Sequence, residues 1–402
     1  MSQSQTHFDE FQPHSKHKHL ILKQYFLAWG HKLGLRAGAG NLILFVDACA
    51  GRGQDDVGNH GSPLIAAVAA AVAQENVSAR RLCPFHIHVV AIEEDRANNG
   101  ALTKVLAPFG PTVTVLLGTF VDRIDEVEQG YPDTPTLYFI DLFGLKPLSS
   151  DVVRRALTGA KNEALLLFAD QAALRHFGAI IAEETRAERR HRLAADPLPL
   201  FPTLVAAGIH DLANAATESR EALEITRENA LRIMNSAFGD ENWLAQIELV
   251  PQHLRRRELI NLYSSRLRSW GATHTLRVPI ADSSGTHAYT LIHASKSSKA
   301  YTTMKEAVSN ALDHSPLPAS VVDRMRELVR CGLDVLETEV RRKFAGRTVR
   351  WSEHPQDRNA KCVRKIVLEE SEAYPFELDE LKSHLRRLQL PGRSLVYSFP
   401  VE

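Results

Sequence analysis

Short apolar runs alternate with amphipathic stretches through the first part of the chain. The apolar runs end at polar or glycine residues and predict buried strands over 42–46, 86–92, 112–117, 137–140 and 165–168. Apolar residues at helical spacing between them predict helices over 64–73, 96–106 and 151–158. This alternation favours an α/β fold with a parallel sheet that helices cover on both faces.

The region before the first strand has a different pattern. Residues 1–17 are polar, and we expect them to be frayed. From 19 to 35, apolar residues recur at helical spacing and predict an amphipathic helix that docks on the sheet (Leu22, Tyr25, Phe26, Trp29 and Leu33). Residues 36–40 form a glycine-rich break.

The second half begins with a charged region, 174–270, whose pattern is mainly helical. A D-S-S-G turn at 282–285 separates strands expected at 273–280 and 287–294, and a helix is expected at 300–312. The predicted organisation begins with a helical lead-in at 1–40, followed by an α/β domain in two pieces, 41–173 and 271–312. A helical insertion at 174–270 lies between these pieces, and a small winged-helix-like α+β module is expected at 317–402.

Charge changes this picture only when it is counted by region. The 402 residues carry 48 Lys and Arg and 48 Asp and Glu, which argues against a uniformly basic nucleic-acid coat protein. Residues 51–150, however, have a balance of −5, and residues 251–350 have a balance of +8. A polyanion partner should therefore prefer the C-terminal half, although solvated helix faces explain the same charge equally well.

Several classes of protein are disfavoured. The four cysteines are scattered without C-x-x-C spacing, which argues against a disulfide framework, a zinc ribbon or an iron–sulfur cluster held by this chain alone, and we predict no metal site. The longest apolar run, 63–73, is too short to span a bilayer, and the N-terminus has no apolar signal core. These features predict a cytoplasmic protein without a membrane partner.

The segment L-I-L-F-V-D-A-C-A-G-R-G at 42–53 carries the clearest chemical signal. A buried strand ends at Asp47, and Gly51 and Gly53 follow in a turn that lets the backbone approach a ligand. The turn lacks the third glycine of a dinucleotide site and is acidic where a pyrophosphate would lie, and the chain has no phosphate-binding P-loop. An acid with an A-G-x-G turn suits S-adenosylmethionine better, because that ligand has an ammonium group and no phosphate.

The following strand ends fit the same ligand. Glu93 stands where a carboxylate can accept both ribose hydroxyls, and the third strand ends at 116–120, near where an adenine ring would lie. The fourth strand ends in L-Y-F-I-D-L-F-G at 137–144. An ordinary doubly wound sheet with capped strand ends is the alternative.

Six segments together resemble the three-Cys-motif partner family (TcmP). They are S-K-H-K-H-L-I-L-K-Q-Y-F-L-A-W, V-D-A-C-A-G-R-G, G-S-P-L-I-A, A-I-E-E-D, Y-F-I-D-L-F-G and Y-T-L-I-H-A-S-K, and they lie within residues 15–312. This family looks like class I methyltransferases and is similar to bacterial 23S rRNA adenine-N6 methyltransferases. The resemblance implies a Rossmann-like methyltransferase sheet and a neighbouring partner protein with three clustered cysteines.

The resemblance also implies roles for individual residues. Asp47, Ala50, Gly51 and Gly53 match the cofactor loop, Glu93 matches the ribose-binding acid, and Thr119 stands where the family often has an Asp beside adenine. Asp141 and Phe143 match the residues that hold and stack the acceptor base in amino-methyltransferases. Leu142 replaces the usual proline between them, which puts catalysis in doubt more than binding.

A second group of residues suggests contact with nucleic acid. Five arginines near the end of the mainly helical region could grip phosphates (Arg255, Arg256, Arg257, Arg266 and Arg268). Tyr263 and Trp270 interleave with them, as base-stacking residues would. A solvated helix face with two aromatic residues in the core is an equally good explanation. Ser62, before Pro63, is interpreted as a helix cap.

Two functions remain open at this point. The first is an S-adenosylmethionine-dependent methyltransferase that acts on a nucleic-acid base or a similar amino-bearing acceptor. The second is a non-catalytic adaptor with the same fold, which binds nucleic acid or the three-Cys-motif partner. A nicotinamide oxidoreductase is disfavoured because the glycine loop lacks the dinucleotide spacing.

Overall fold

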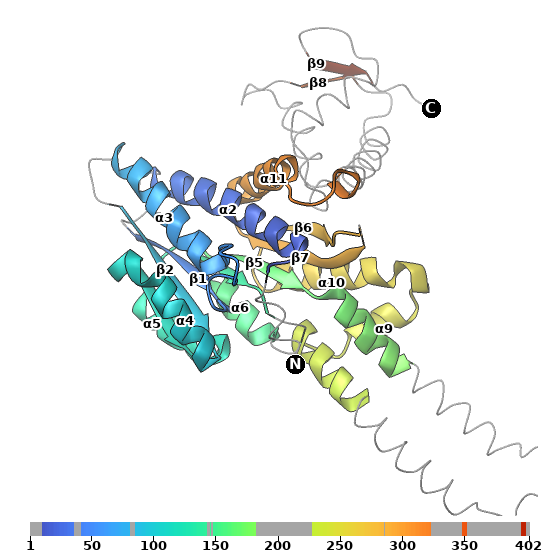
Figure 1. Ribbon diagram of the computed structural model, residues 1–402. Helices are drawn as coiled ribbons and strands as arrows, with labels where there is room; N and C mark the ends of the chain where they lie inside the picture. Colours follow the sequence, from blue (N-terminus) through green and yellow to red (C-terminus); the bar gives the residue numbers. More distant parts are fainter. Residues whose placement is uncertain are drawn as a thin grey trace, which may run out of the picture. The chain divides into compact units, whose positions relative to one another are not determined.

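The computed structural model describes residues 10–35, 42–80, 85–142, 145, 148–181, 227–284 and 286–322, and the backbone of 348–351 and 395–398 (Figure 1). The chain divides into two compact units. The first contains Met1–Asp141, Arg154–Leu167 and Leu267–Glu402, and the second contains Leu142–Val153 and Phe168–Arg266. The longer segment of the second unit, Phe168–Arg266, overlaps most of the region 174–270, where the sequence predicts a helical insertion.

The first unit is built on a seven-stranded sheet in the order β3-β2-β1-β4-β5-β7-β6. The pairs β3–β2, β2–β1, β1–β4 and β4–β5 are parallel, whereas β6 and β7 form an antiparallel hairpin. The α/β fold with a mostly parallel sheet is thereby confirmed. The strands are β1 (Leu42–Asp47), β2 (His86–Glu93), β3 (Val113–Leu117), β4 (Thr136–Ile140), β5 (Glu163–Phe168), β6 (His274–Ala281) and β7 (His287–Ser295).

Most helices lie where the apolar periodicity predicts them. They are α2 (Pro13–Gly34), α3 (Ser62–Ser78), α4 (Arg96–Leu106), α5 (Phe120–Gly130), α6 (Ser150–Thr158) and α11 (Ser298–Asp313), with a 3-10 turn at Ala107–Thr112 after α4. The sequence analysis missed α5, although Phe120, Ile124 and Val127 are buried at helical spacing. The acidic residues between them are mostly exposed, so the segment has the amphipathic pattern of a helix.

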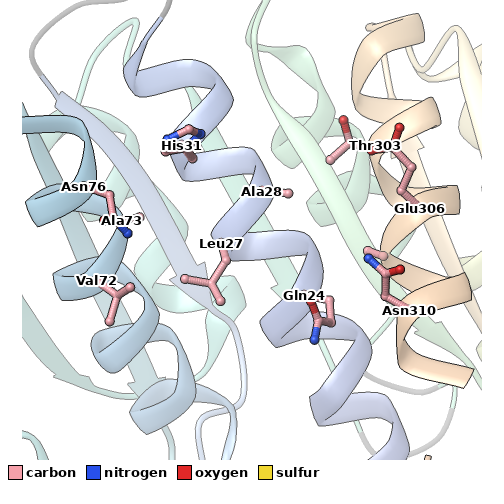
Figure 2. Close-up of a pocket in the computed structure, with 11 residues that line it drawn as sticks. Gln24, Leu27, Ala28, His31, Val72, Ala73, Asn76, Thr303, Glu306 and Asn310 are labelled. Carbon is pink, nitrogen blue, oxygen red and sulfur yellow. The ribbon is translucent and has the colours of Figure 1, made fainter. Parts of the chain in front are cut away.

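One face of the sheet carries the main hydrophobic core. Side chains alternate along the strands, so Phe45 of β1, Val89 of β2 and Phe139 of β4 point to the same side. Helices α2, α3 and α11 cover these residues, and α2 lies between the other two (Figures 1 and 2). Helix α4 packs beside α3 on this face through Leu102.

Helix α2 begins earlier than the sequence predicts. Its first residue is Pro13, which suits the first turn of a helix because proline has no backbone N–H to satisfy there. The expectation of a frayed region to residue 17 is wrong for this part, because Ser15 and His17 are buried. The His17 ring has no hydrogen-bond partner in the described part of the chain, and burial lowers its pKa to about 4. His17 is therefore neutral at physiological pH.

The opposite face of the sheet is covered by α5 and α6. Tyr138 of β4 points to this side and packs against Phe120 of α5, with ring centroids 6.0 Å apart. Arg155 of α6 holds the two helices together by ion pairs to Asp125 and to Glu128, the latter at 2.7 Å. Because these pairs are partly exposed, they contribute less to stability than the apolar contacts beneath them.

The second unit is helical in its described part. It contains helices at 170–181 and 227–238, α9 (Trp243–Glu248), a 3-10 turn (Gln252–Leu254) and most of α10 (Arg255–Ser269). Its core is a cluster of aromatic rings: Phe168, Phe177, Phe238, Trp243 and Tyr263. The Trp243 ring is held in this cluster by a hydrogen bond, which its indole Nε1 donates to Asn235 Oδ1 at 2.7 Å.

Little of the predicted C-terminal module lies within the described residues. Strands β8 (Thr348–Trp351) and β9 (Leu395–Ser398) pair antiparallel, with Thr348 opposite Ser398. The winged-helix-like arrangement predicted for 317–402 otherwise lies outside the described part and stays a prediction. None of the helices in the described residues is long and apolar enough to cross a membrane.

The close approach of α2 to α3 and β2 requires glycine at the end of α2. A Cβ on Gly34 would lie 2.7 Å from Val77 Cγ2 and 2.8 Å from Phe85 Cε1. We expect Gly34→Ala to destabilise the protein by about 1–3 kcal/mol, because overpacking outweighs the gain in helix propensity. Urea unfolding followed by circular dichroism measures the change.

A matched control is available in α4. A Cβ on Gly100 would meet nothing within 4 Å, so Gly100→Ala should stabilise the helix by about 0.5–1 kcal/mol. If both substitutions stabilise the protein alike, the close packing at Gly34 does not limit the fold.

Candidate functional site

Three carboxylates lie at one edge of the sheet, where neighbouring parallel strands end. Asp47 ends β1, Glu93 ends β2, and Asp141 directly follows β4. β1 lies between β2 and β4 in the sheet, so the three groups come from adjacent strands. The carboxyl edge of a parallel sheet is the usual place for a ligand. We call these residues and the groups that contact them the carboxylate edge.

Asp47 is the most deeply buried member of the carboxylate edge. Its side chain is fully enclosed, and its Oδ1 accepts a hydrogen bond from the Cys49 amide at 3.3 Å. Its Oδ2 has no partner in the described part of the chain. Burial raises the pKa of Asp47 to about 7, and the charge of Asp141 adds to the rise, while the Ser62 hydroxyl, the Cys49 amide and Lys18 oppose it. An unpaired buried oxygen of this kind is a ready acceptor for a ligand N–H or O–H.

Ser62 does not take the role that the sequence analysis gave it. The N-cap of α3 is Gly61, and Ser62 is the first helical residue, so the interpretation as a helix cap is wrong. Gly61 is favoured at the cap because its amide donates to Gly53 O at 2.8 Å and a Cβ would lie 3.0 Å from that oxygen. The Ser62 hydroxyl lies beside Asp47 instead.

Lys18 of α2 supplies a buried cation to the carboxylate edge. Its Nζ donates to Asp141 Oδ2, and it lies 5.8 Å from the ring centroid of Tyr289. Burial alone would lower the pKa of the Lys18 ammonium, but the charges of Asp141 and Asp47 and the hydrogen bond to Asp141 raise it overall. Lys18 therefore remains protonated, and its hydrogen bond holds the Asp141 carboxylate in position.

The sequence analysis did not select Lys18, although the pattern contains a signal. Lys18 stands four residues before Leu22 and seven before Tyr25, which places it on the buried face of α2. A lysine on such a face needs an anionic partner. The partner was hidden because Asp141 is 123 residues away in the chain.

The glycine loop after β1 is held by Glu93. The two oxygens of Glu93 accept the Gly51 amide at 2.8 Å and the Asp95 amide at 2.9 Å, and only 5% of the residue is exposed. Ala50, also buried, donates its amide to Ile92 O at 2.9 Å. Glu93 thus organises the loop, and its predicted contact with a ribose stays a prediction that must use its remaining lone pairs.

The two glycines of the loop have conformations that favour glycine. Gly51 has φ 61° and Gly53 has φ 79°, both in the left-handed region. At Gly53 a Cβ would also lie 2.9 Å from Leu102 Cδ1 of α4. Packing inside the protein therefore accounts for Gly53 without a ligand.

Asp55 and Asp56, the acids that argue against a pyrophosphate in this loop, both bind other groups of the protein. Asp55 accepts the Phe11 amide at 2.9 Å and the Asn59 amide at 2.6 Å, and burial, which raises its pKa, is outweighed by these hydrogen bonds, which lower it. Asp56 pairs with Arg52 at 3.0 Å. The Asp55 bonds tie the loop to the chain that enters α2.

Thr119, expected near adenine, is the N-cap of α5. Its Oγ1 accepts from the Asp122 amide at 3.2 Å and donates to Asp122 Oδ2 at 2.7 Å. Gly118 before it has φ 143° and leads the chain from β3 into the helix. Both residues lie at the carboxyl end of β3, next to β2 in the sheet. A contact with adenine at Thr119 stays a prediction.

The predicted acceptor residues are only partly described. Asp141 has 20% of its side chain exposed, so one side of the carboxylate is open to a partner other than Lys18. Phe143 lies outside the described residues. The stacking role predicted for Phe143 is therefore untested.

The predicted phosphate-binding arginines lie on α10, and most of them have partners inside the protein. Arg255 donates to Val250 O at 2.9 Å, Arg266 pairs with Asp240 at 2.8 Å, and Arg268 donates to Thr275 Oγ1 at 2.9 Å. Arg256 is half-buried, and Arg257 is exposed beside Glu258, 3.3 Å away. Their contact with nucleic acid stays a prediction.

The aromatic residues of this group differ in exposure. Tyr263 is fully buried and stacks on Phe168 at a centroid distance of 4.4 Å, so a base-stacking role for it is wrong. Tyr263 lies on the buried face of α10 and packs in the core instead. Trp270 is half-buried, and the Arg154 guanidinium lies 5.2 Å from its ring centroid.

Within the described residues, no group of three His, Cys, Asp or Glu side chains is arranged to hold a metal ion. Comparison of the sequence with protein-family models and with curated proteins gives no match. The resemblance to the three-Cys-motif partner family therefore stays a prediction, and the site must be interpreted from its own geometry.

The burial of Asp47 makes stability depend on pH. The native state holds a proton on Asp47 up to about pH 7, whereas the unfolded chain releases it near the ordinary pKa of 3.8. Wild-type stability should therefore fall as pH rises from about 4 to about 7, and Asp47→Asn should remove this decline. Above pH 7 the variant should be more stable by roughly 2–4 kcal/mol. Urea unfolding at a series of pH values measures the difference, with the exposed Asp56→Asn as control; parallel profiles for wild type and Asp47→Asn would contradict the assignment.

A double-mutant cycle tests the ion pair. Lys18→Met should destabilise the protein because it leaves two carboxylates near one another without a cation. Asp141→Asn in the same chain should recover part of the loss, with a coupling free energy of about 1–3 kcal/mol. Additive effects in urea unfolding would mean that Lys18 contributes only its apolar stem.

Proposed function

We propose that the protein is an S-adenosylmethionine-dependent methyltransferase that acts on a nucleic-acid base or a similar amino-bearing acceptor. The observation that carries this proposal is the carboxylate edge, where Asp47, Glu93 and Asp141 end adjacent strands. Such a row offers separate acceptors for the ammonium and hydroxyl groups of a cofactor and for the amino group of an acceptor.

The topology of the sheet supports the proposal. β7 lies between β5 and β6 and runs antiparallel to β6. The sheet therefore has the order 3-2-1-4-5-7-6 and ends in an antiparallel pair. It differs from the dinucleotide-binding order 3-2-1-4-5-6, which also weakens the case for a nicotinamide enzyme.

The residues of the carboxylate edge fit the cofactor at one point in particular. Asp47 Oδ2 is buried without a partner in the described chain, and a bound ammonium or hydroxyl would satisfy it. The turn with Ala50, Gly51 and Gly53 follows directly, and Glu93 and Thr119 stand at the next two strand ends. S-adenosylmethionine would supply an electrophilic methyl group, and these residues would only bind and orient.

The acceptor side of the reaction falls to Asp141. An ionised carboxylate can accept a hydrogen bond from an amino group and direct its lone pair toward the methyl carbon. Lys18 is the positioning residue in this scheme, because its ammonium donates to Asp141 Oδ2 and so holds the carboxylate in one orientation. Transfer of this kind depends on orientation more than on acid–base chemistry.

A non-catalytic adaptor is the second candidate, and one observation favours it. Two of the three carboxylates of the carboxylate edge already have strong protein partners, since Lys18 binds Asp141 and two backbone amides bind Glu93. A scaffold that no longer binds cofactor would retain such contacts for stability. In that case the protein would bind nucleic acid or a three-Cys-motif partner without methyl transfer.

Calorimetry and a transfer assay separate the two candidates. Wild type should bind S-adenosylmethionine and S-adenosylhomocysteine, and Asp47→Ala should weaken binding about tenfold or more, because a charge-assisted hydrogen bond contributes about 1.5–3 kcal/mol. Asp141→Ala should retain cofactor binding and lose transfer of labelled methyl groups to RNA or DNA at least 100-fold.

Glu75→Ala on the exposed surface of α3 is the matched control and should change neither measurement. A protein that binds neither compound at millimolar concentration is not a methyltransferase. If cofactor binds but no nucleic acid is methylated while nucleic acid is still bound, the adaptor is the better description.

A further inference from the structure

A cavity lies at the edge of the sheet opposite the carboxylate edge, where the parallel strands begin. It has a volume of about 710 Å³, within the range of small-molecule sites. The second half of α2, the start of β5 and the first turn of α11 form it. Its principal lining residues are Trp29, Lys32, Leu33, Glu163, Ser297 and Lys299. Asp47 and Asp141 belong to the other edge, so this cavity is separate from the carboxylate edge.

The sheet topology brings these segments together. β7 ends at Ser295, and Lys296 directly after it donates to Thr158 O and Gly159 O, both at 2.9 Å. These contacts fix the start of α11 beside the turn that leads into β5. Glu163, the first residue of β5, therefore lies near the N-terminus of α11.

Glu163 is a buried acid that is held firmly and still has an oxygen available. Its side chain is only 9% exposed. Its Oε2 accepts from the Tyr25 hydroxyl and lies 3.2 Å from His293 Nε2, and Tyr25 and His293 contact each other at 3.0 Å. Its Oε1 makes no hydrogen bond to the described residues and is not enclosed, so it is the atom that Glu163 presents to the cavity.

The wall of the cavity is apolar. Trp29 is 3% exposed, and its indole Nε1 has no hydrogen-bond partner among the described side chains and backbone. Leu33 and Leu35 continue this wall along α2. Because this Nε1 is enclosed, Trp29 offers a bound molecule apolar ring surface and not a hydrogen-bond donor.

The rim of the cavity is positive. α11 has 16 residues and begins here, and Ser297 caps it by accepting the Ala300 amide at 3.3 Å. Lys299 is exposed in the first turn. Lys32 binds Thr303 Oγ1 at 2.8 Å and Glu306 at 3.1 Å. A helix N-terminus with a lysine beside it favours a carboxylate.

We propose that this cavity binds a free α-amino acid with an apolar side chain. The ammonium group would contact Glu163 Oε1, the carboxylate would lie at the start of α11 near Lys299, and the side chain would pack on Trp29 and Leu33. The neighbouring hollow of about 360 Å³ between α3, α2 and α11 lacks this arrangement (Figure 2). Its polar lining in Figure 2 consists of three amides (Gln24, Asn76 and Asn310) together with His31, Thr303 and Glu306, and Glu306 is already paired with Lys32.

Titration of the whole protein with L-leucine and L-phenylalanine tests the proposal, which does not depend on methyl transfer. Calorimetry should show binding of both, and tryptophan fluorescence should change in parallel. The leucine analogues 3-methylbutylamine and 4-methylpentanoate lack the carboxylate and the amine, respectively. Each should bind at least about tenfold more weakly, because each loses one charge-assisted contact.

Three variants locate the site. Lys299→Glu should raise the Kd for leucine about tenfold, whereas Lys23→Glu, on an exposed position of α2, should leave it unchanged. Glu163→Gln should weaken binding similarly, with circular dichroism to check that the buried cluster still folds. Trp29→Phe should retain binding by calorimetry and lose most of the fluorescence change.

Three results would overturn the proposal. They are no binding of either amino acid at millimolar concentration, binding of 4-methylpentanoate as tight as that of leucine, and an unchanged affinity in Lys299→Glu. Because Lys299 is exposed, its substitution remains informative even if Glu163→Gln fails to fold.

Discussion

The burial of one helix against the sheet determines most of what this protein can do. Helix α2 runs between α3 and α11 and covers the apolar face formed by Phe45, Val89 and Phe139. It also contributes polar side chains at both edges of the sheet. Lys18 reaches the ends of the parallel strands, and Tyr25 contacts Glu163 at the start of β5. Neither polar cluster would exist without the apolar contacts that hold the helix in place.

Burial has opposite consequences for the charged groups in these clusters. It raises the pKa of Asp47 to about 7, because the loss of water outweighs the hydrogen bonds to Asp47 and the attraction of Lys18. For Lys18 the neighbouring carboxylates outweigh burial, and the ammonium stays charged. The carboxylate edge thus combines Asp47, whose pKa burial raises, with Asp141, which is paired with a buried ammonium. Carboxylates in such different environments are typical of sites where separate groups must be recognised.

The sequence predicts the sheet well because each strand is a local apolar run. The end of β1 at Asp47 and of β2 at Glu93 follows from the position of the first polar residue after each run. The same local signal explains why α4 was predicted with its observed bounds. Contacts between distant residues were not predictable in this way. The pairing of Lys18 with Asp141, the burial of Tyr263 under Phe168 and the cap at Gly61 all depend on three-dimensional neighbours.

The place of α2 at the start of the chain has a practical consequence. A shortened protein that begins at β1 would keep every strand of the sheet and every residue of the glycine loop after β1. It would nevertheless expose Phe45 and Phe139 to solvent and leave Asp141 and Glu163 without Lys18 and Tyr25. Such a fragment should aggregate when it is produced, since large exposed apolar patches promote association. Trimming the N-terminus for crystallisation should therefore stop before Phe11, whose amide binds Asp55.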